Sequence, residues 1–232
     1  MTSQRGIALI LALLVTSFLS AIGLGLAVMV FMDRLATGNT RGSVAMLYAA
    51  DAGIELAAHE LSRADWNAAL AGLEQASFSD GVPIGVRGIP GGGTVNLTAE
   101  TNALNCGKQT PCTVAQMEAN TDERPWGVNN PRWRLYAYSP FENVTEVARP
   151  TPCYVAVWIA DDTRERDGDP LADGEEAGRG VLRVRAAAFG PLGSRHAIEA
   201  ELARVCFDAN GEELCQPGIR VQSWQEARQL VP

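Results

Sequence analysis

The N-terminal part of the chain carries a long, unbroken run of hydrophobic positions. Residues 7–32 read IALILALLVTSFLSAIGLGLAVMVFM and contain no charged residue. A membrane-spanning helix needs about 20 consecutive apolar residues, whereas the apolar core of a cleaved secretory signal has roughly 7 to 15. The run therefore predicts one membrane-spanning helix. Arg5 precedes it and Asp33 follows it, a charge order that predicts a cytoplasmic N-terminus with the remainder on the other side of the membrane.

The next segment, residues 33–65, changes from a continuous to a periodic hydrophobic pattern. Apolar side chains recur every three or four positions, which predicts an amphipathic helix outside the membrane. The polar stretch GNTRG at 38–42 has glycine at both ends and predicts a hinge. The periodic positions are Leu47, Ala50, Ile54, Ala57 and Leu61.

Beyond this helix the pattern predicts loops and then strands. Residues 66–93 are rich in glycine and proline and are expected to form a linker. The remaining segment, 94–232, is expected to form an antiparallel sheet, with GPLG at 190–193 as a hairpin turn. The fold class is therefore α+β, a long N-terminal helix packed on an antiparallel sheet. The predicted strands are 94–100, 133–139, 153–160, 180–189 and 194–206.

The charge and the cysteine content limit the functions and the cellular compartments that fit this chain. The 19 basic and 27 acidic residues give a formal charge of -8, and no basic stripe is present, which argues against nucleic-acid binding. All five cysteines lie beyond residue 100, on the far side of the membrane run. This placement predicts that the part of the chain beyond the membrane run, called the head below, lies in an oxidising compartment.

The junction at the start of the apolar run resembles the leader of prepilins. Gln4-Arg5-Gly6 is followed directly by Ile7 and the hydrophobic run. The segment MLYAADAGIELAAHEL at 46–61 resembles the AFxAAEAGxxxAxxxL-like pattern of PilX-type minor pilins, and VQSWQE at 221–226 resembles their VxSWxE-type end. The resemblance implies a pilin-like fold, with residues 1–6 as a leader that the prepilin peptidase removes between Gly6 and Ile7, and N-methylation of Ile7.

The same resemblance implies a role in type IV pilus assembly. The chain would reside in the bacterial inner membrane, with its head in the periplasm, and then enter the filament. Expected partners are the major pilin, other minor pilins, the prepilin peptidase, the inner-membrane assembly platform and a tip adhesin. Ordinary pilins carry glutamate at the fifth mature position, where this chain has Leu11. Because that glutamate is thought to pair with a neighbouring subunit's terminal amine, its loss implies a place at or near the filament tip.

Two alternatives remain open at the level of sequence. A type II secretion pseudopilin K also lacks the glutamate, although that family has a larger inserted helical domain and a two-calcium site. A single-pass periplasmic binding protein or enzyme would keep its N-terminal residues. No catalytic motif accompanies His59 or His196, so both are interpreted as surface or packing residues and the chain is not expected to be an enzyme.

The cysteine spacing suggests disulfides rather than a metal site. Cys206 and Cys215 flank an Asn-Gly turn, and Cys106 and Cys112 enclose a short Gly- and Pro-containing loop, which leaves Cys153 over. With five cysteines any one can be the odd residue and the other four can pair in three ways, so the connectivity stays open. Zinc is disfavoured because no C-x-x-C spacing is present.

An acidic run at 161–176 offers oxygen ligands for Ca²⁺. Its spacing does not match the twelve-residue EF-hand register, so a solvated acidic loop is the favoured interpretation and no other cofactor is expected. The calcium-ligand candidates are Asp161, Asp162, Asp167, Asp169 and Asp173.

Overall fold

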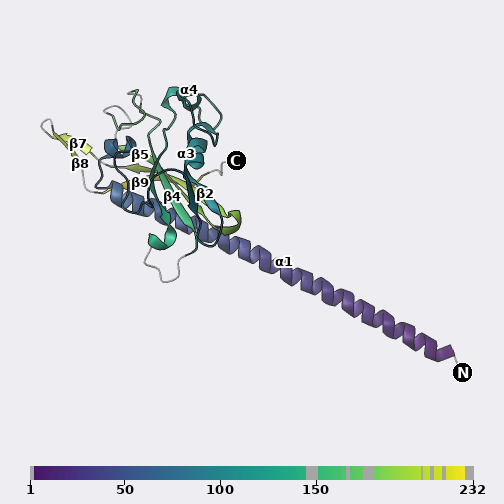
Figure 1. Cartoon of the computed structure of the whole chain (residues 1–232). Helices are drawn as coiled ribbons and strands as arrows, with labels where there is room; N and C mark the ends of the chain where they lie inside the picture. Colours follow the sequence, from purple (N-terminus) through teal and green to yellow (C-terminus); the bar gives the residue numbers. More distant parts are fainter. Residues whose placement is uncertain are drawn as a thin grey trace. The chain divides into compact units, whose positions relative to one another are not determined.

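The computed structural model describes residues 3–144, 151–165, 168–174, 180–204, 206–209, 212–215 and 218–227, with the backbone alone at 3–6, 206–209 and 212–215. The chain divides into two compact units, residues 1–42 and residues 43–232. The first unit is the N-terminal part of one helix. The second contains the rest of that helix and the strands that the structure describes (Figure 1).

Helix α1 (Ser3–Leu61) contains both hydrophobic patterns without interruption. The helix is continuous through Gly38 and Gly42, although a glycine inside a helix costs about 1 kcal/mol relative to alanine. The two units divide between Gly42 and Ser43, and the hinge expected at 38–42 stays a prediction. At the other end, Trp66 Nε1 donates a hydrogen bond of 2.9 Å to Leu61 O, which satisfies one of the last free carbonyls of the helix.

The second unit is built on a five-stranded antiparallel sheet with the order β3-β4-β5-β6-β9. A 3-10 turn, η3 (Pro191–Gly193), joins β5 to β6, which confirms the predicted hairpin. The outer edge of β3 is covered, because Ala76 N and Asp80 N donate hydrogen bonds to Tyr136 O and Tyr138 O. The strands are β3 (Arg134–Pro140), β4 (Tyr154–Asp161), β5 (Val181–Phe189), β6 (Arg195–Ala203) and β9 (Arg220–Glu226).

Smaller elements surround this sheet. Two antiparallel pairs, β1 with β2 and β7 with β8, lie outside it. They are β1 (Val86–Gly88), β2 (Thr94–Asn96), β7 (Cys206–Ala209) and β8 (Glu212–Cys215). The short helices are α2 (Trp66–Leu70), α3 (Leu97–Cys106), α4 (Val114–Met117), η1 (Gly127–Asn129) and η2 (Phe141–Asn143).

The centre of the sheet is covered on both faces, which explains why β4 is buried along its whole length. On one face, α1 packs Met46, Ile54 and Leu61 against alternate strand residues. On the other face, Leu97 and Leu104 of α3 pack in a cluster with Trp158 and other aromatic residues. The apolar run of β4 is what such double coverage requires.

The predicted strand 94–100 is wrong after its third residue. Strand β2 ends at Asn96, whose side chain accepts a hydrogen bond from Ala99 N and caps helix α3. Gly107 ends the helix in the left-handed conformation, with φ of 71°. These are the standard start and stop signals of a helix. The predicted linker 66–93 likewise contains α2 and β1.

Strand β9 was not predicted, and its sequence explains the omission. All of its residues are exposed, and it shows no simple alternation because the register with β6 shifts between Glu201 and Leu202. The predicted strand 194–206 corresponds to β6 followed by the separate β7. Asn210 and Gly211 lie outside the described residues, but the pairing of Ala209 with Glu212 fits the predicted hairpin.

Candidate functional site

The first unit presents an exposed, uncharged apolar surface over residues 7–32. The window of α1 with the highest mean hydropathy, 2.6, has none of its residues buried. Within the described residues, α1 is the one helix long and apolar enough to cross a membrane. The hydroxyls of Thr16 and Ser17 donate hydrogen bonds to Leu13 O and Leu14 O. Such internal bonds lower the cost of placing hydroxyls in an apolar environment.

The residues of the leader junction lie within this helix. Gly6 is helical, and Ile7 and Leu11 are each 60% exposed. Leu11 continues the apolar surface of the helix. Since the surface around Leu11 offers only apolar contacts, it can associate with lipid or with other apolar helices but cannot neutralise a terminal amine.

Small residues let α1 approach the sheet closely in the second unit. Ala49, Ala50 and Ala57 are fully or almost fully buried in the core. Gly53 lies against Val155 and Val157 of β4, where a Cβ would stand 2.8 Å from Val155 Cγ1. The AADAG segment at 49–53 lies on this face, so it contributes to the packing of α1 against the sheet.

The structure contains the predicted Cys106–Cys112 disulfide. It closes a short loop between α3 and α4, with a Cα–Cα distance of 6.0 Å. Cys206 and Cys215 are directly opposite each other in the β7–β8 pair, but their side chains lie outside the described part, so their pairing stays a prediction. Cys153 is a free, buried thiol, and burial raises its pKa to about 12. A thiol in that environment is unreactive.

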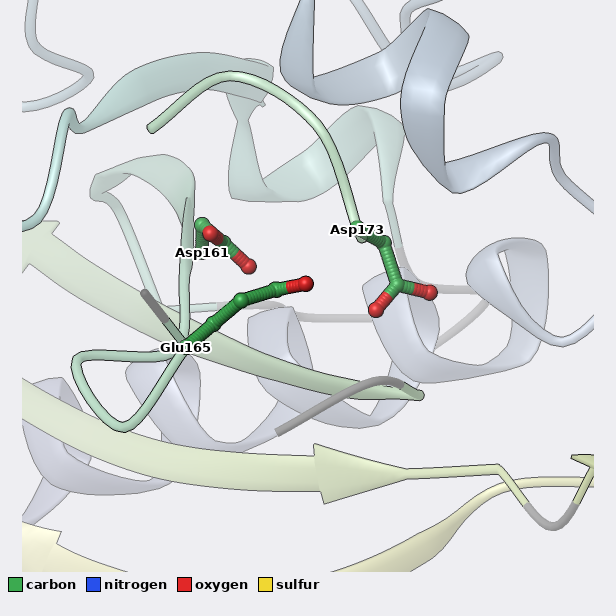
Figure 2. Close-up of side chains that lie close together, drawn as sticks. All are labelled: Asp161, Glu165 and Asp173. Carbon is green, nitrogen blue, oxygen red and sulfur yellow. The ribbon is translucent and has the colours of Figure 1, made fainter. Parts of the chain in front are cut away.

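Three acidic side chains meet at the C-terminal end of β4. Figure 2 shows the carboxylate of Glu165 between those of Asp161 and Asp173. One carboxylate oxygen from each lies within 4.8 Å of the others. Asp161 and Glu165 are buried, so the cluster differs from the solvated loop favoured by sequence. Asp173 accepts a hydrogen bond of 2.7 Å from Gly180 N and lies 3.8 Å from Arg204 Nη2.

Burial sets the protonation of this cluster. Burial, followed by the negative charge of Glu165, raises the pKa of Asp161 to about 9. At neutral pH the buried pair of Asp161 and Glu165 therefore retains a proton. Three carboxylates are also a fitting set of oxygen ligands for a divalent cation, which would replace that proton. The arrangement can thus share a proton or bind a cation.

The two other calcium candidates that the structure describes, Asp162 and Asp169, do not join the cluster. Asp162 is buried and pairs with Arg164, whose Nε lies 2.8 Å from Asp162 Oδ2. Asp169 accepts a hydrogen bond from Leu171 N and shapes its own turn. Asp167 lies outside the described residues. Glu165 was not among the candidates, although its position four residues after Asp161 was a usable signal.

The two histidines lie apart from these groups. His59 Nε2 is 3.3 Å from Arg63 Nη1 on the exposed side of α1. His196 Nε2 is 3.4 Å from Glu226 Oε2, between the strands β6 and β9.

Comparison with known proteins identifies no relative of this chain. No family model, no curated protein and no solved structure matches the chain.

Proposed function

We propose that this chain is a minor pilin, similar to the PilX type, that takes part in type IV pilus assembly at or near the filament tip. The observation that carries the proposal is helix α1, which contains an exposed, uncharged apolar run at 7–32 and, after a polar stretch, small residues that pack on an antiparallel sheet. A filament subunit needs such a helix, because the same surface must lie in lipid before assembly and against other helices afterwards.

The leader junction supports this proposal over a permanent anchor. Removal of residues 1–6 would leave the apolar run intact and place its first residue, Ile7, at the new terminus. An anchor for a periplasmic enzyme or binding protein needs no such junction. A pseudopilin K is less well supported, because the chain segment between α1 and the five-stranded sheet has only short helices where that family has a larger helical domain.

Leu11 supports placement near the tip. A subunit with glutamate at this position could neutralise the terminal amine of the subunit it joins, whereas the leucine surface cannot. The subunit would then occupy a place in the filament, such as the tip, where it does not have to pair with the terminal amine of another subunit. Its partners in this proposal are other minor pilins, the major pilin, the assembly platform, the prepilin peptidase and a tip adhesin.

The test is the composition of sheared surface filaments. An antibody to the head should detect the chain in the filament fraction of cells, in small amount and at filament ends by immunogold labelling. Replacement of Gly6 by leucine, which alters the cleavage junction, should remove it from that fraction and leave it in the membrane. A matched Gly25→Leu variant, within the apolar run, should still reach the filament. Equal amounts in the filament fraction for both variants would contradict the proposal.

A further inference from the structure

An open cleft lies beside the first residues of β3, and its lining contains none of the three carboxylates of the acidic cluster. Its volume is about 590 Å³, within the range of sites that bind small organic ligands or short peptide segments. Helices α3 and α4, strand β3 and the turn containing Leu171 contribute its walls. The apolar side chains that line it include Ile84, Met117, Trp133, Leu135 and Leu171.

Positive charge gathers in this cleft although the whole chain is acidic. Arg132 and Arg134 line it, and Glu118 is the one carboxylate among its lining residues. Arg132 Nη2 lies 3.3 Å from Glu118 Oε1, and the Arg132 side chain is 9% exposed. Its buried Nη1 has no hydrogen-bond partner among the described residues. Glu118 therefore satisfies only one side of this guanidinium.

Arg134 is the accessible cation of the cleft. Its side chain is exposed, and within the described ranges it makes no hydrogen bond or ion pair. An Arg guanidinium offers a planar fork of donors that matches a carboxylate. Asn102 lines the same cleft and donates from Nδ2 to Gln109 O at 3.2 Å.

A third arginine increases the excess of positive charge. Arg124 donates from Nη2 to Pro131 O at 2.9 Å. Burial, and then the positive charge of Arg132, lowers the pKa of Arg124 to about 10. The pKa of Arg132 is also lowered, mainly by burial and against the opposing effect of Glu118. Arg124 is half-buried and does not line the cleft, but its charge opposes that of the buried Arg132. An anion bound near Arg132 would reduce this repulsion.

We propose that this cleft binds a carboxylate attached to an apolar group. Arg134 would contact the carboxylate directly, and the buried Arg132 would contribute its positive charge without direct contact. The apolar part of the ligand would lie against Trp133, Leu135 and Met117. The apolar walls favour an organic acid over inorganic phosphate, which would leave them in contact with a hydrated ion. The carboxylate can come from the C-terminus of a peptide or from a free short-chain acid. This inference does not depend on the role in a pilus.

The test is a calorimetric titration of the full chain in micelles of dodecyl maltoside, a detergent without a carboxylate. The probes are N-acetyl-Ala-Val-Leu as the free acid and as the amide, and 4-methylpentanoate with 4-methylpentanamide. We expect at least one acid to bind about tenfold or more tightly than its amide, which corresponds to about 1.4 kcal/mol. The peptide or the short acid binding alone would identify the source of the carboxylate.

Two variants that each remove one positive charge distinguish binding in the cleft from nonspecific electrostatic attraction to the protein. Arg134→Gln should weaken binding of the acid to the level of the amide, whereas Arg220→Gln, at an exposed position on β9, should leave it unchanged. Circular dichroism should show the same unfolding midpoint for Arg134→Gln as for the parent chain. Equal affinity for acid and amide, absence of binding by every probe, or retention of acid binding in Arg134→Gln would overturn the proposal.

Discussion

Gly53 of α1 lies so close to Val155 of β4 that a Cβ at residue 53 would stand 2.8 Å from Val155 Cγ1. That distance is too short for a normal contact, so the helix and the sheet can meet here only because residue 53 has no side chain. Both faces of the contact are fully buried. The position of α1 on the sheet is therefore sensitive to a single methyl group.

Replacement of Gly53 by alanine should destabilise the head. Overpacking costs about 1–3 kcal/mol, and the better helix propensity of alanine returns about 1 kcal/mol. The net loss of about 1 kcal/mol corresponds to a midpoint lower by about 2–4 °C, measurable by near-ultraviolet circular dichroism. Gly42→Ala is the control, because nothing lies within 4 Å of that position. Equal midpoints for the two variants would contradict the close packing.

A second contact ties the edge strand to the helix. Trp224 Nε1 of β9 donates a hydrogen bond of 3.0 Å to Asp51 Oδ1 of α1. Trp224→Phe should lower the free energy of unfolding by about 1 kcal/mol, since the bond is to a charged group but is partly exposed. A double-mutant cycle with Asp51→Ala checks this value. Additive effects of the two substitutions would show that the contact contributes nothing to stability.

The acidic cluster predicts a dependence of stability on pH. The pKa of Asp161 is raised to about 9, so the folded state holds a proton that the unfolded state loses above its ordinary pKa of about 4. The contribution of Asp161 to the free energy of unfolding is therefore fully present below pH 4. It decreases as the pH rises from 4 to 9, by no more than about 1.4 kcal/mol per pH unit. Chemical unfolding at several pH values measures the slope.

Asp161→Asn provides the matched comparison for that slope, because asparagine resembles the protonated acid in shape. The variant should show a flatter profile between pH 5 and 8 and should exceed the parent chain in stability at pH 8. An unchanged slope would contradict a proton on Asp161. A rise in the parent's midpoint with added Ca²⁺ at pH 8, absent in the variant, would instead assign a cation to the cluster.

The Cys106–Cys112 disulfide should contribute to stability despite its short loop. The sequence separation is 6, and chain-entropy arguments give about 2 kcal/mol for a loop of this length. The double variant Cys106→Ser, Cys112→Ser should therefore unfold at a lower denaturant concentration than the parent under oxidising conditions. The free thiol of Cys153 provides the control, since Cys153→Ala should retain the disulfide and its contribution. An unchanged denaturation midpoint in the double variant would contradict the expectation.

The sequence predicted the long elements well because their hydrophobic patterns are strong. The apolar run and the periodic positions gave one helix, and the apolar strands β4 and β5 were found within one residue of their ends. Helix α3 was missed because its cap, Asn96, also fits a strand end. Strand β9 was missed because its exposed residues lack a pattern, and its pairing with β6 is a tertiary contact.

The candidate site was predicted in part for similar reasons. The acidic run was visible, but which of its carboxylates meet depends on the turn after β4, which brings Glu165 to Asp161 and turns Asp162 toward Arg164. The cleft was not predicted at all. Its arginines, Arg132 and Arg134, meet residues from α3 and α4 only through the tertiary fold.

The mass of the N-terminal peptide, from chain extracted from the membrane of its native host, distinguishes a processed filament subunit from a permanent anchor. A processed subunit begins at Ile7 and has one added methyl group on its amine, which is the result we expect. A chain that retains Met1 through Gly6 would show that α1 is a permanent anchor and would overturn the proposed function.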